Sequence, residues 1–279
     1  MSDSLLAAHT FALIGCGNMG RAIVGGLLRG HDLDPAHIRA TRRTAILRDA
    51  LAADFPGLAP TADNRAAVDG ATVVVLAVKP QNVAGVVEEI REAVSDDALV
   101  ISILAGITTD ALEAAFGRPL AVVRAMPNTP ALVDEGATAL AAGRHAAPEQ
   151  LALARAIFEA VGLVEEVPEG LMDAVTGLSG SGPAYIYMVI EALTDGGVKQ
   201  GLPRPTAARL AAQTVLGAAR LVLETGKHPA ILRDEVTTPG GTAIAAVADL
   251  EAHGLRTMLI NAVGTATTRS QELRRGLER

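Results

Sequence analysis

A short apolar strand that runs into a glycine turn and then a helix constrains this chain most. Phe11–Ile14 is followed by Gly15-Cys16-Gly17-Asn18-Met19-Gly20, and Arg21–Arg29 has helical character. In such a turn the first glycine permits the sharp bend, the second lets the backbone approach a pyrophosphate, and the third allows close helix–strand packing. The helix start presents N–H groups and a positive dipole end to phosphate. This pattern predicts dinucleotide binding by Gly15, Gly17, Asn18, Met19 and Gly20.

The first half of the chain repeats short apolar runs between helical stretches. A run such as Val73–Val78 is apolar on both faces, as a strand must be when helices cover both sides of a parallel sheet. The spacing of the runs is typical of βα units. Strands are predicted at Phe11–Ile14, Ile38–Thr41, Val73–Val78, Leu99–Leu104 and Leu120–Ala125. We therefore expect an α/β fold with an N-terminal Rossmann-type, doubly wound parallel sheet over residues 1–168.

The pattern changes after Pro168, where long Ala- and Leu-rich segments replace the β-branched runs. Helices are predicted at about Leu171–Gly196, Pro205–Thr225, Thr242–Leu250 and Leu255–Leu273. Ala207–Leu223 has so little polar patterning that a helix in a monomer would expose a large apolar surface. We expect an all-α dimerisation domain over residues 169–279 and a homodimer. Burial of this surface within one subunit is the alternative.

The end of the second predicted strand indicates which dinucleotide is bound. An NAD site has an acidic residue there for the ribose 2′-hydroxyl, whereas this chain has Thr41-Arg42-Arg43. Arginine forms bidentate, charge-assisted bonds with phosphate oxygens, so the pattern favours NADPH over NADH. The alternative is a solvated, charged helix start.

Two further segments are placed to contact the cofactor. Ala77-Val78-Lys79-Pro80 ends the third strand at the carboxyl edge of the sheet, where open α/β sheets bind ligands. Asn64 begins a helix and is a candidate for the adenosine end. An exposed lysine at a strand end and simple N-capping by Asp63 or Asn64 are the alternatives.

A loop rich in hydroxyls and glycines, Asp234–Thr242, precedes a predicted helix. Free N–H groups at that helix start, with the Thr238 and Thr242 hydroxyls, suit a small carboxylate. Plain N-capping by a threonine is the alternative. Ser179 and Ser181 lie in a second glycine turn, but no nearby His or Asp suggests a nucleophilic serine.

Composition and charge exclude several classes. The formal net charge of -7 disfavours a nucleic-acid surface, and the single cysteine, Cys16, excludes an intramolecular disulfide. The six histidines show no metal-ligand spacing, so no metal is expected. The N-terminus lacks signal-peptide features, and no apolar run reaches the roughly 18 residues of a membrane helix. We expect a cytoplasmic protein without nucleic-acid or membrane partners.

Taken together, several motifs resemble those of pyrroline-5-carboxylate reductase along nearly the whole chain. The matching stretches are Ile14–Gly20, Ala77–Gln81, Arg124-Ala125-Met126-Pro127-Asn128-Thr129-Pro130, Ser179–Tyr185, Asp195–Val198 and Asp234–Thr242. The resemblance implies reduction of 1-pyrroline-5-carboxylate, a cyclic imine, to proline by NADPH, with NADH weaker, as the last step of proline biosynthesis. It also implies homodimers, larger assemblies of dimers, and a substrate site where one subunit's nicotinamide meets the partner's loop.

The resemblance also assigns residues. NADPH would be held by Gly15, Gly17, Asn18, Met19, Gly20, Thr41, Arg42, Arg43, Asn64, Ala77, Val78, Lys79 and Pro80. The substrate would be surrounded by Val236, Thr237, Thr238, Gly240, Gly241 and Thr242. Family members commonly have a second threonine after this loop, bonding the ring nitrogen, but this chain has Ala243. Either Thr242 or a water makes that contact, or the nitrogen is held less tightly.

Two other functions compete with this interpretation. A β-hydroxyacid dehydrogenase has a similar two-domain plan but needs a catalytic lysine, and Lys199 reads better as a helix-end charge. A non-catalytic NADPH-binding regulator would keep the glycine turn and lose the Thr237–Thr242 loop, which is intact here.

Overall fold

The structure, a computed structural model, describes residues 2–31 and 33–277 and contains two compact units. The first unit extends to Ser181 and also includes the segment from Thr265 onward, and the second is Gly182–Gly264. The domain boundary expected at residue 168 stays a prediction. Among the described residues, no helix is both long and apolar enough to cross a membrane.

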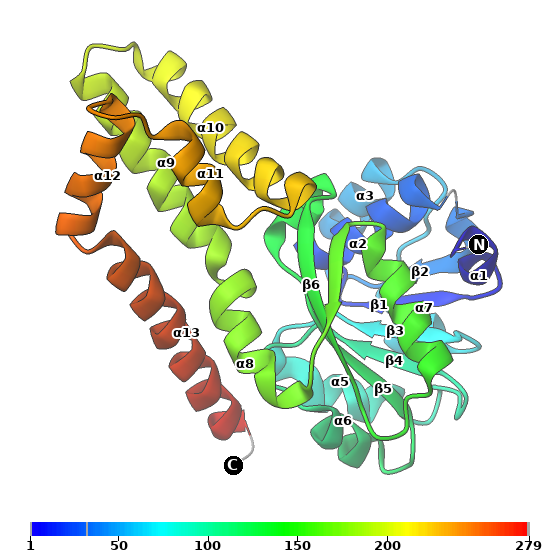
Figure 1. The fold of residues 1–279 in the computed structure, drawn as a ribbon. Coiled ribbons are helices and arrows are strands. Elements are labelled where there is room, and N and C mark those ends of the chain that lie inside the picture. The colour runs from blue at the N-terminus through cyan, green and yellow to red at the C-terminus, as the bar shows by residue number, and fades with distance from the viewer. Residues whose placement is uncertain (1, 32, 278–279) are drawn as a thin grey trace. The chain divides into compact units, whose positions relative to one another are not determined.

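The first unit contains one seven-stranded sheet (Figure 1). Its strands are β1 (Phe11–Ile14), β2 (Ile38–Ala40), β3 (Val73–Leu76), β4 (Leu99–Ser102), β5 (Ala121–Met126), β6 (Gly136–Ala142) and β7 (Gly162–Glu166). The order is β2-β1-β3-β4-β5-β6-β7, and every pair is parallel except β5 with β6. The five predicted strands and the doubly wound α/β class are confirmed.

Strands β6 and β7 were not predicted. The sequence of β6 is Gly-Ala-Thr-Ala-Leu-Ala-Ala and β7 ends in two glutamates, so neither resembles the β-branched runs of β1 to β5. They form strands because the sheet supplies pairing partners and because Leu140 and Val164 are buried. Tertiary context outweighs local propensity here.

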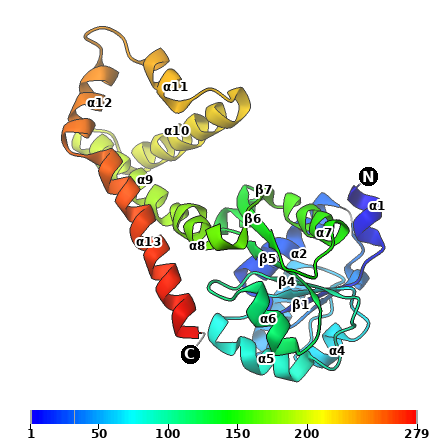
Figure 2. The same cartoon turned by 60° about the horizontal axis from the view of Figure 1, so that its bottom comes forward.

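Alternation along the strands divides the core of the first unit into two layers. Phe11 and Leu13 of β1 face one apolar cluster, while Ala12 and Ile14 face the other. Helices α2 (Asn18–Gly30), α3 (Ala45–Asp54) and α7 (Pro148–Glu159) pack on the first face, and α4 (Asn64–Val68), α5 (Val83–Ile90) and α6 (Thr109–Phe116) on the second. Figure 2 shows the sheet between these two layers. A short helix, α1 (Ser2–Ala7), precedes β1.

The second unit is entirely helical. It comprises α9 (Gly182–Lys199), α10 (Arg204–Thr225), α11 (Pro229–Val236), α12 (Thr242–Ala252) and the start of α13 (Leu255–Leu277). Helix α11 was not predicted. It includes Asp234–Val236, which were expected to belong to the loop, and the loop before α12 is therefore shorter than expected. The first long predicted helix is also interrupted: α8 (Met172–Val175) continues into a π-helical turn at Thr176–Gly180 before α9.

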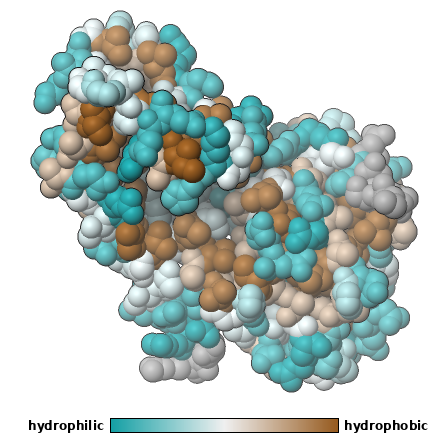
Figure 3. Space-filling view, in the orientation of Figure 1, coloured by the Kyte–Doolittle hydropathy of each residue, from teal (hydrophilic) through white to brown (hydrophobic). Residues whose placement is uncertain are grey.

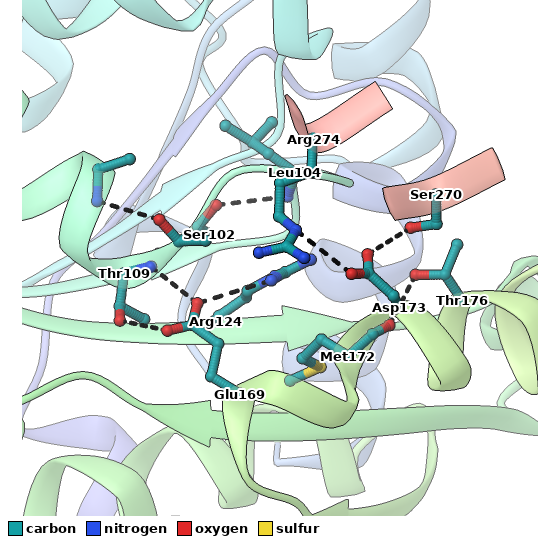
Figure 4. Close-up of polar contacts among 12 residues, drawn as sticks. Ser102, Leu104, Thr109, Arg124, Glu169, Met172, Asp173, Thr176, Ser270 and Arg274 are labelled. Atoms are coloured by element: carbon teal, nitrogen blue, oxygen red, sulfur yellow. Dashed lines mark hydrogen bonds and ion pairs between the residues drawn. The ribbon is translucent and has the colours of Figure 1, made fainter. Parts of the chain in front are cut away.

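A polar cluster lies inside the first unit, around the largest fully buried side chain, Arg124 (Figure 4). Arg124 Nη1 is 3.6 Å from Glu169 Oε1, and burial lowers the pKa of Arg124 while Glu169 and Asp173 oppose this shift. Glu169 also accepts bonds from the Thr109 N–H at 2.8 Å and the Thr109 hydroxyl at 2.7 Å. This carboxylate therefore joins β5 to the start of α6.

The C-terminal part of α13 is fixed to the same cluster by Asp173. The Ser270 hydroxyl donates to Asp173 Oδ1 at 2.7 Å, and Arg274 Nε lies 3.3 Å from Asp173 Oδ2. Asp173 is only 6% exposed. A carboxylate this buried is costly unless it is paired and hydrogen-bonded, so Asp173 and the end of α13 stabilise each other.

We expect Asp173→Asn to lower the free energy of unfolding by about 2 kcal/mol, because the amide still accepts the Ser270 bond but loses the charge attraction to Arg274. Denaturant unfolding at fixed protein concentration measures this. Asp134→Asn is the control, because Asp134 pairs with Arg29 on the surface and its loss should cost under about 0.5 kcal/mol. Equal effects of the two variants would contradict the assignment.

Candidate functional site

The glycine turn between β1 and α2 has the geometry that the sequence predicts. Gly15 has φ +84, and a Cβ built on it would lie 2.6 Å from Val78 Cγ1. Gly20 lies against Cys16, whose Sγ would be 3.1 Å from an added Cβ. Gly17 is the N-cap of α2 and has no side chain to cap the helix, and the structure records no bond from a described side chain to the first amides. The turn thus leaves N–H groups free at a helix start, as a pyrophosphate site requires.

Thr41 holds this turn from the end of β2. Its hydroxyl accepts the Gly15 N–H at 2.9 Å, and its carbonyl accepts the Cys16 N–H at 2.9 Å. Thr41 is 2% exposed. Its hydroxyl is therefore engaged with the turn, and the cationic groups come from the next two residues, the half-buried Arg42 and the exposed Arg43.

An open pocket of about 600 Å³ lies along the carboxyl ends of β1, β2 and β3. The arginines that follow β2 line it, and the Arg42 Nη1 atom is 3.7 Å from the position of a Cβ on Gly17. Two guanidinium groups beside a glycine turn give the pocket phosphate-binding chemistry. Its size and its glycine wall fit an extended dinucleotide.

The structure brings most predicted cofactor residues together in this pocket. Those that line it are Gly15, Gly17, Thr41, Arg42, Arg43, Asn64, Ala77, Val78 and Lys79. Asn18, Met19, Gly20 and Pro80 do not: Gly20 is buried, Met19 packs against the core, and Asn18 is exposed at the helix start. Asp63 caps α4 by accepting from the Ala66 N–H at 3.0 Å, and the Asn64 amide donates to Glu89 at 2.9 Å.

Sequence reasoning missed the wall of the pocket that follows β3. These residues are Gln81, Asn82, Gly85, Val86 and Glu89. Gln81 and Asn82 belong to a 3-10 turn and the other three to α5. Their only local signal is their position just after a strand that ends at the ligand-binding edge of the sheet.

The predicted substrate loop lies in the helical unit and is exposed. Helix α11 ends at Val236, whose side chain is 67% exposed, and the Thr237 hydroxyl donates to the Asp234 carbonyl at 3.0 Å. Gly241 is the N-cap of α12 and provides no side-chain cap, and within residues 2–31 and 33–277 no side-chain bond to the first amides of α12 is recorded. The start of α12 is therefore open to a ligand, and carboxylate binding by this loop stays a prediction.

Two glycines give this loop its shape. Gly240 has φ +67, which side chains disfavour. An added Cβ on Gly241 would lie 2.3 Å from the Thr238 hydroxyl, and the Gly241 N–H donates to the Thr238 carbonyl at 2.9 Å. Thr237 and Thr238 are thus held on a tight turn at the start of α12, and Thr242 is the first residue of that helix.

The end of β5 is tied to the π-helical turn by Asn128. Its side-chain oxygen Oδ1 accepts the Ala137 N–H at 2.8 Å, and its side-chain Nδ2 donates to the Ser179 carbonyl at 3.1 Å. Gly180 lies so close to Met126 that an added Cβ would be 2.9 Å from the methyl carbon. The two predicted motifs, Arg124–Pro130 and Ser179–Tyr185, therefore meet at the carboxyl edge of the sheet.

Burial governs the chemistry of Cys16. The thiol is buried and its pKa is raised to about 12 by desolvation, although Arg42 and Arg21 act in the opposite direction. A thiol with so high a pKa is protonated at neutral pH and is a poor nucleophile.

We expect the Cys16 thiol of the native protein to react with iodoacetamide at pH 8 at least about 100-fold more slowly than that of the unfolded protein. Equal rates, followed by mass spectrometry, would contradict the burial of this thiol.

The two glycines of the turn should respond differently to a methyl group. Gly15→Ala is expected to lower stability by about 2 kcal/mol or more, because it combines a positive φ with a contact that is too short. Gly17→Ala should leave stability nearly unchanged, since nothing lies within 3.7 Å, yet weaken NADPH binding by roughly tenfold or more. Thermal unfolding and fluorescence titration measure the two effects. Normal NADPH affinity in Gly17→Ala would place the pyrophosphate elsewhere.

Comparison with known proteins places the chain among reductases. The family model described as pyrroline-5-carboxylate reductase dimerisation matches residues 169–273, and the model described as NADP oxidoreductase, coenzyme F420-dependent, matches residues 10–106. A pyrroline-5-carboxylate reductase from Synechocystis is 49% identical over 264 residues, which are 94% of this chain and 97% of the relative. The enzyme from Escherichia coli is 41% identical over 93% of this chain and 96% of its own.

Solved structures agree with these matches. A pyrroline-5-carboxylate reductase from Coxiella burnetii has a TM-score of 0.89 and 43% identity, covering 95% of this chain and 98% of that one. The Plasmodium falciparum pyrroline carboxylate reductase with NADP bound has a TM-score of 0.85 and 28% identity, covering 96% and 99%. The identity and the coverage show that this chain belongs to the pyrroline-5-carboxylate reductase family of NAD(P)H-dependent oxidoreductases.

Proposed function

We propose that this protein reduces 1-pyrroline-5-carboxylate to proline with NADPH, the last step of proline biosynthesis. The observation that carries the proposal is the pocket on the glycine turn, where Arg42 and Arg43 stand in place of an acidic residue. Family membership supplies the substrate class. The Plasmodium relative has NADP bound, which supports the choice of cofactor.

In this proposal each part of the pocket holds one part of NADPH. The free amides at the start of α2 bind the pyrophosphate, and the guanidinium groups of Arg42 and Arg43 bind the 2′-phosphate. Thr41 acts through the turn, because its hydroxyl is already bonded to Gly15. Asn64 and the segment from Ala77 to Pro80 line the remaining length of the cofactor.

The exposed loop between α11 and α12 is the proposed substrate cradle. The uncapped amides of α12 and the Thr238 hydroxyl would bind the carboxylate of the imine, with Val236, Thr237, Gly240, Gly241 and Thr242 around the ring. Ala243 has no hydroxyl, so Thr242 or a water would bond the ring nitrogen. Each substrate site would form where the nicotinamide held by one subunit meets this loop of the partner subunit.

The proposed chemistry requires orientation more than acid–base catalysis. When bound, the reduced nicotinamide supplies a hydride to the carbon of the C=N bond. A protonated imine is already electrophilic, so this chain needs to supply no strong acid, and its residues contribute by fixing the imine carboxylate and the cofactor phosphates.

We further propose a homodimer in the cytoplasm, built from the helical unit. Figure 3 shows apolar side chains among hydrophilic ones on the visible face of this unit, over α11 and α12. Exposed apolar residues of the unit include Ile186, Tyr187, Met188, Leu210, Leu216, Leu221, Leu223, Ile231, Ile244, Leu250, Met258 and Ile260. So many are typical of an interface. The match to a dimerisation model covers the same helices.

NADPH oxidation at 340 nm with 1-pyrroline-5-carboxylate tests the proposal. We expect turnover with NADPH and slower turnover with NADH. Turnover only on hydroxybutyrate derivatives would indicate the β-hydroxyacid dehydrogenase, and NADPH binding without turnover on any cyclic imine would indicate a regulator.

The two arginines predict a change in cofactor preference. Arg42→Ala combined with Arg43→Ala should weaken NADPH binding by about 100-fold, because two charge-assisted contacts to phosphate are lost, and change NADH binding by less than about threefold. Calorimetric titration with each dinucleotide measures both. Equal losses for NADPH and NADH would place the 2′-phosphate elsewhere.

A further inference from the structure

A third arginine lies behind the two that face the pocket. Arg48, in the first turn of α3, uses one terminal nitrogen, Nη1, to donate to the carbonyl of Arg42 at 3.0 Å and to that of Arg43 at 2.9 Å. Arg48 is not among the residues that line the pocket. It contacts the backbone of the phosphate-binding pair rather than the space where the phosphate would lie.

We propose that Arg48 is a positioning residue that determines the preference for NADPH, by fixing the backbone from which Arg42 and Arg43 project. The inference rests on the proposed 2′-phosphate site. Arg42 and Arg43 would touch the phosphate, and Arg48 would act only through them.

The surroundings of this segment show why it needs such a support. On the β2 side, the Arg42 N–H donates to the Thr61 carbonyl at 2.9 Å. On the α3 side, the Thr44 carbonyl accepts the N–H groups of Leu47 and Arg48 at 3.1 Å, and the Thr44 side chain makes no cap. Between these two anchors, the bonds that the structure records for the Arg42 and Arg43 carbonyls come from Arg48.

The direction of these two carbonyls bears on phosphate binding. A carbonyl oxygen carries partial negative charge and repels a phosphate. The guanidinium group of Arg48 attracts such a carbonyl oxygen. In this proposal Arg48, which does not line the pocket, holds both oxygens on its own side and so keeps them from the phosphate and limits the conformations of the two arginines. NADH lacks the 2′-phosphate and does not contact the two arginines, so the loss of Arg48 should weaken the binding of NADPH and not that of NADH.

Two substitutions separate the geometry of Arg48 from its charge. Arg48→Met removes both, while Arg48→Lys keeps the charge on a side chain that ends one atom short of Nη1. Arg118→Met is the matched control, because Arg118 also donates to two backbone carbonyls, those of Arg91 and Val94, and does not line the pocket. The readouts are the calorimetric dissociation constants of NADPH and NADH for the purified full-length protein, with thermal unfolding of each variant.

We expect Arg48→Met to weaken NADPH binding by about tenfold and NADH binding by less than about twofold, the effect of losing two hydrogen bonds to a charged group that act through the backbone. Arg48→Lys should lower the preference for NADPH over NADH almost as much as Arg48→Met does. Arg118→Met should leave the ratio of the two constants unchanged even if it lowers the unfolding temperature.

Several results would overturn the inference. An unchanged NADPH to NADH ratio in Arg48→Met would show that Arg48 does not support the site, and wild-type behaviour of Arg48→Lys would show that its charge alone matters. A changed ratio in Arg118→Met would make the effect a general consequence of destabilisation. The variant lacking both Arg42 and Arg43, measured in parallel, identifies failure of the 2′-phosphate site itself, since its ratio would then also be unchanged.

Discussion

The close approach of the β1–α2 turn to the end of β3 is the constraint on which the rest of the cofactor site depends. Gly15 adopts φ +84 with Val78 in the space where a side chain would stand, and Thr41 accepts the N–H groups of both Gly15 and Cys16. Three strands that are distant in sequence therefore end at one place. The free amides of α2, the arginines after β2 and the segment after β3 converge there because β1 pairs in parallel with both β2 and β3.

The fold was predictable where local pattern and tertiary environment agree. Val73–Leu76 begins with three β-branched valines and is buried on both faces, and the structure places it in the middle of the five parallel strands β2-β1-β3-β4-β5. Strand β6, rich in Ala, forms because β5 and β7 pair with it. Helix α11 was not predicted, and its C-terminal residues Asp234–Val236 lie in the segment that was expected to be a loop. No local pattern indicated the π-helical turn, which Asn128 and Met126 contact from the end of β5 and the loop after it.

The residues of the candidate site also fall into two groups, those that local sequence pattern indicates and those that only the packing of helices brings to the pocket. Residues in the glycine motif and at the strand ends were predictable, since short-range geometry places them at the carboxyl edge of the sheet. Glu89 and Val86 were not, because the packing of α5 on the sheet brings them to the pocket. The role of Arg48 was equally hidden: its two carbonyl bonds depend on how α3 leaves the second strand, and a sequence shows only a charged helix start.

A crystal structure of the protein with NADP⁺ and proline tests the central claim most directly. The account predicts the pyrophosphate on the amides at the start of α2, the 2′-phosphate on Arg42 and Arg43, and the proline carboxylate on the first turn of α12. A 2′-phosphate that points into solvent away from both arginines, or a carboxylate bound outside the Thr237–Thr242 loop, would contradict it.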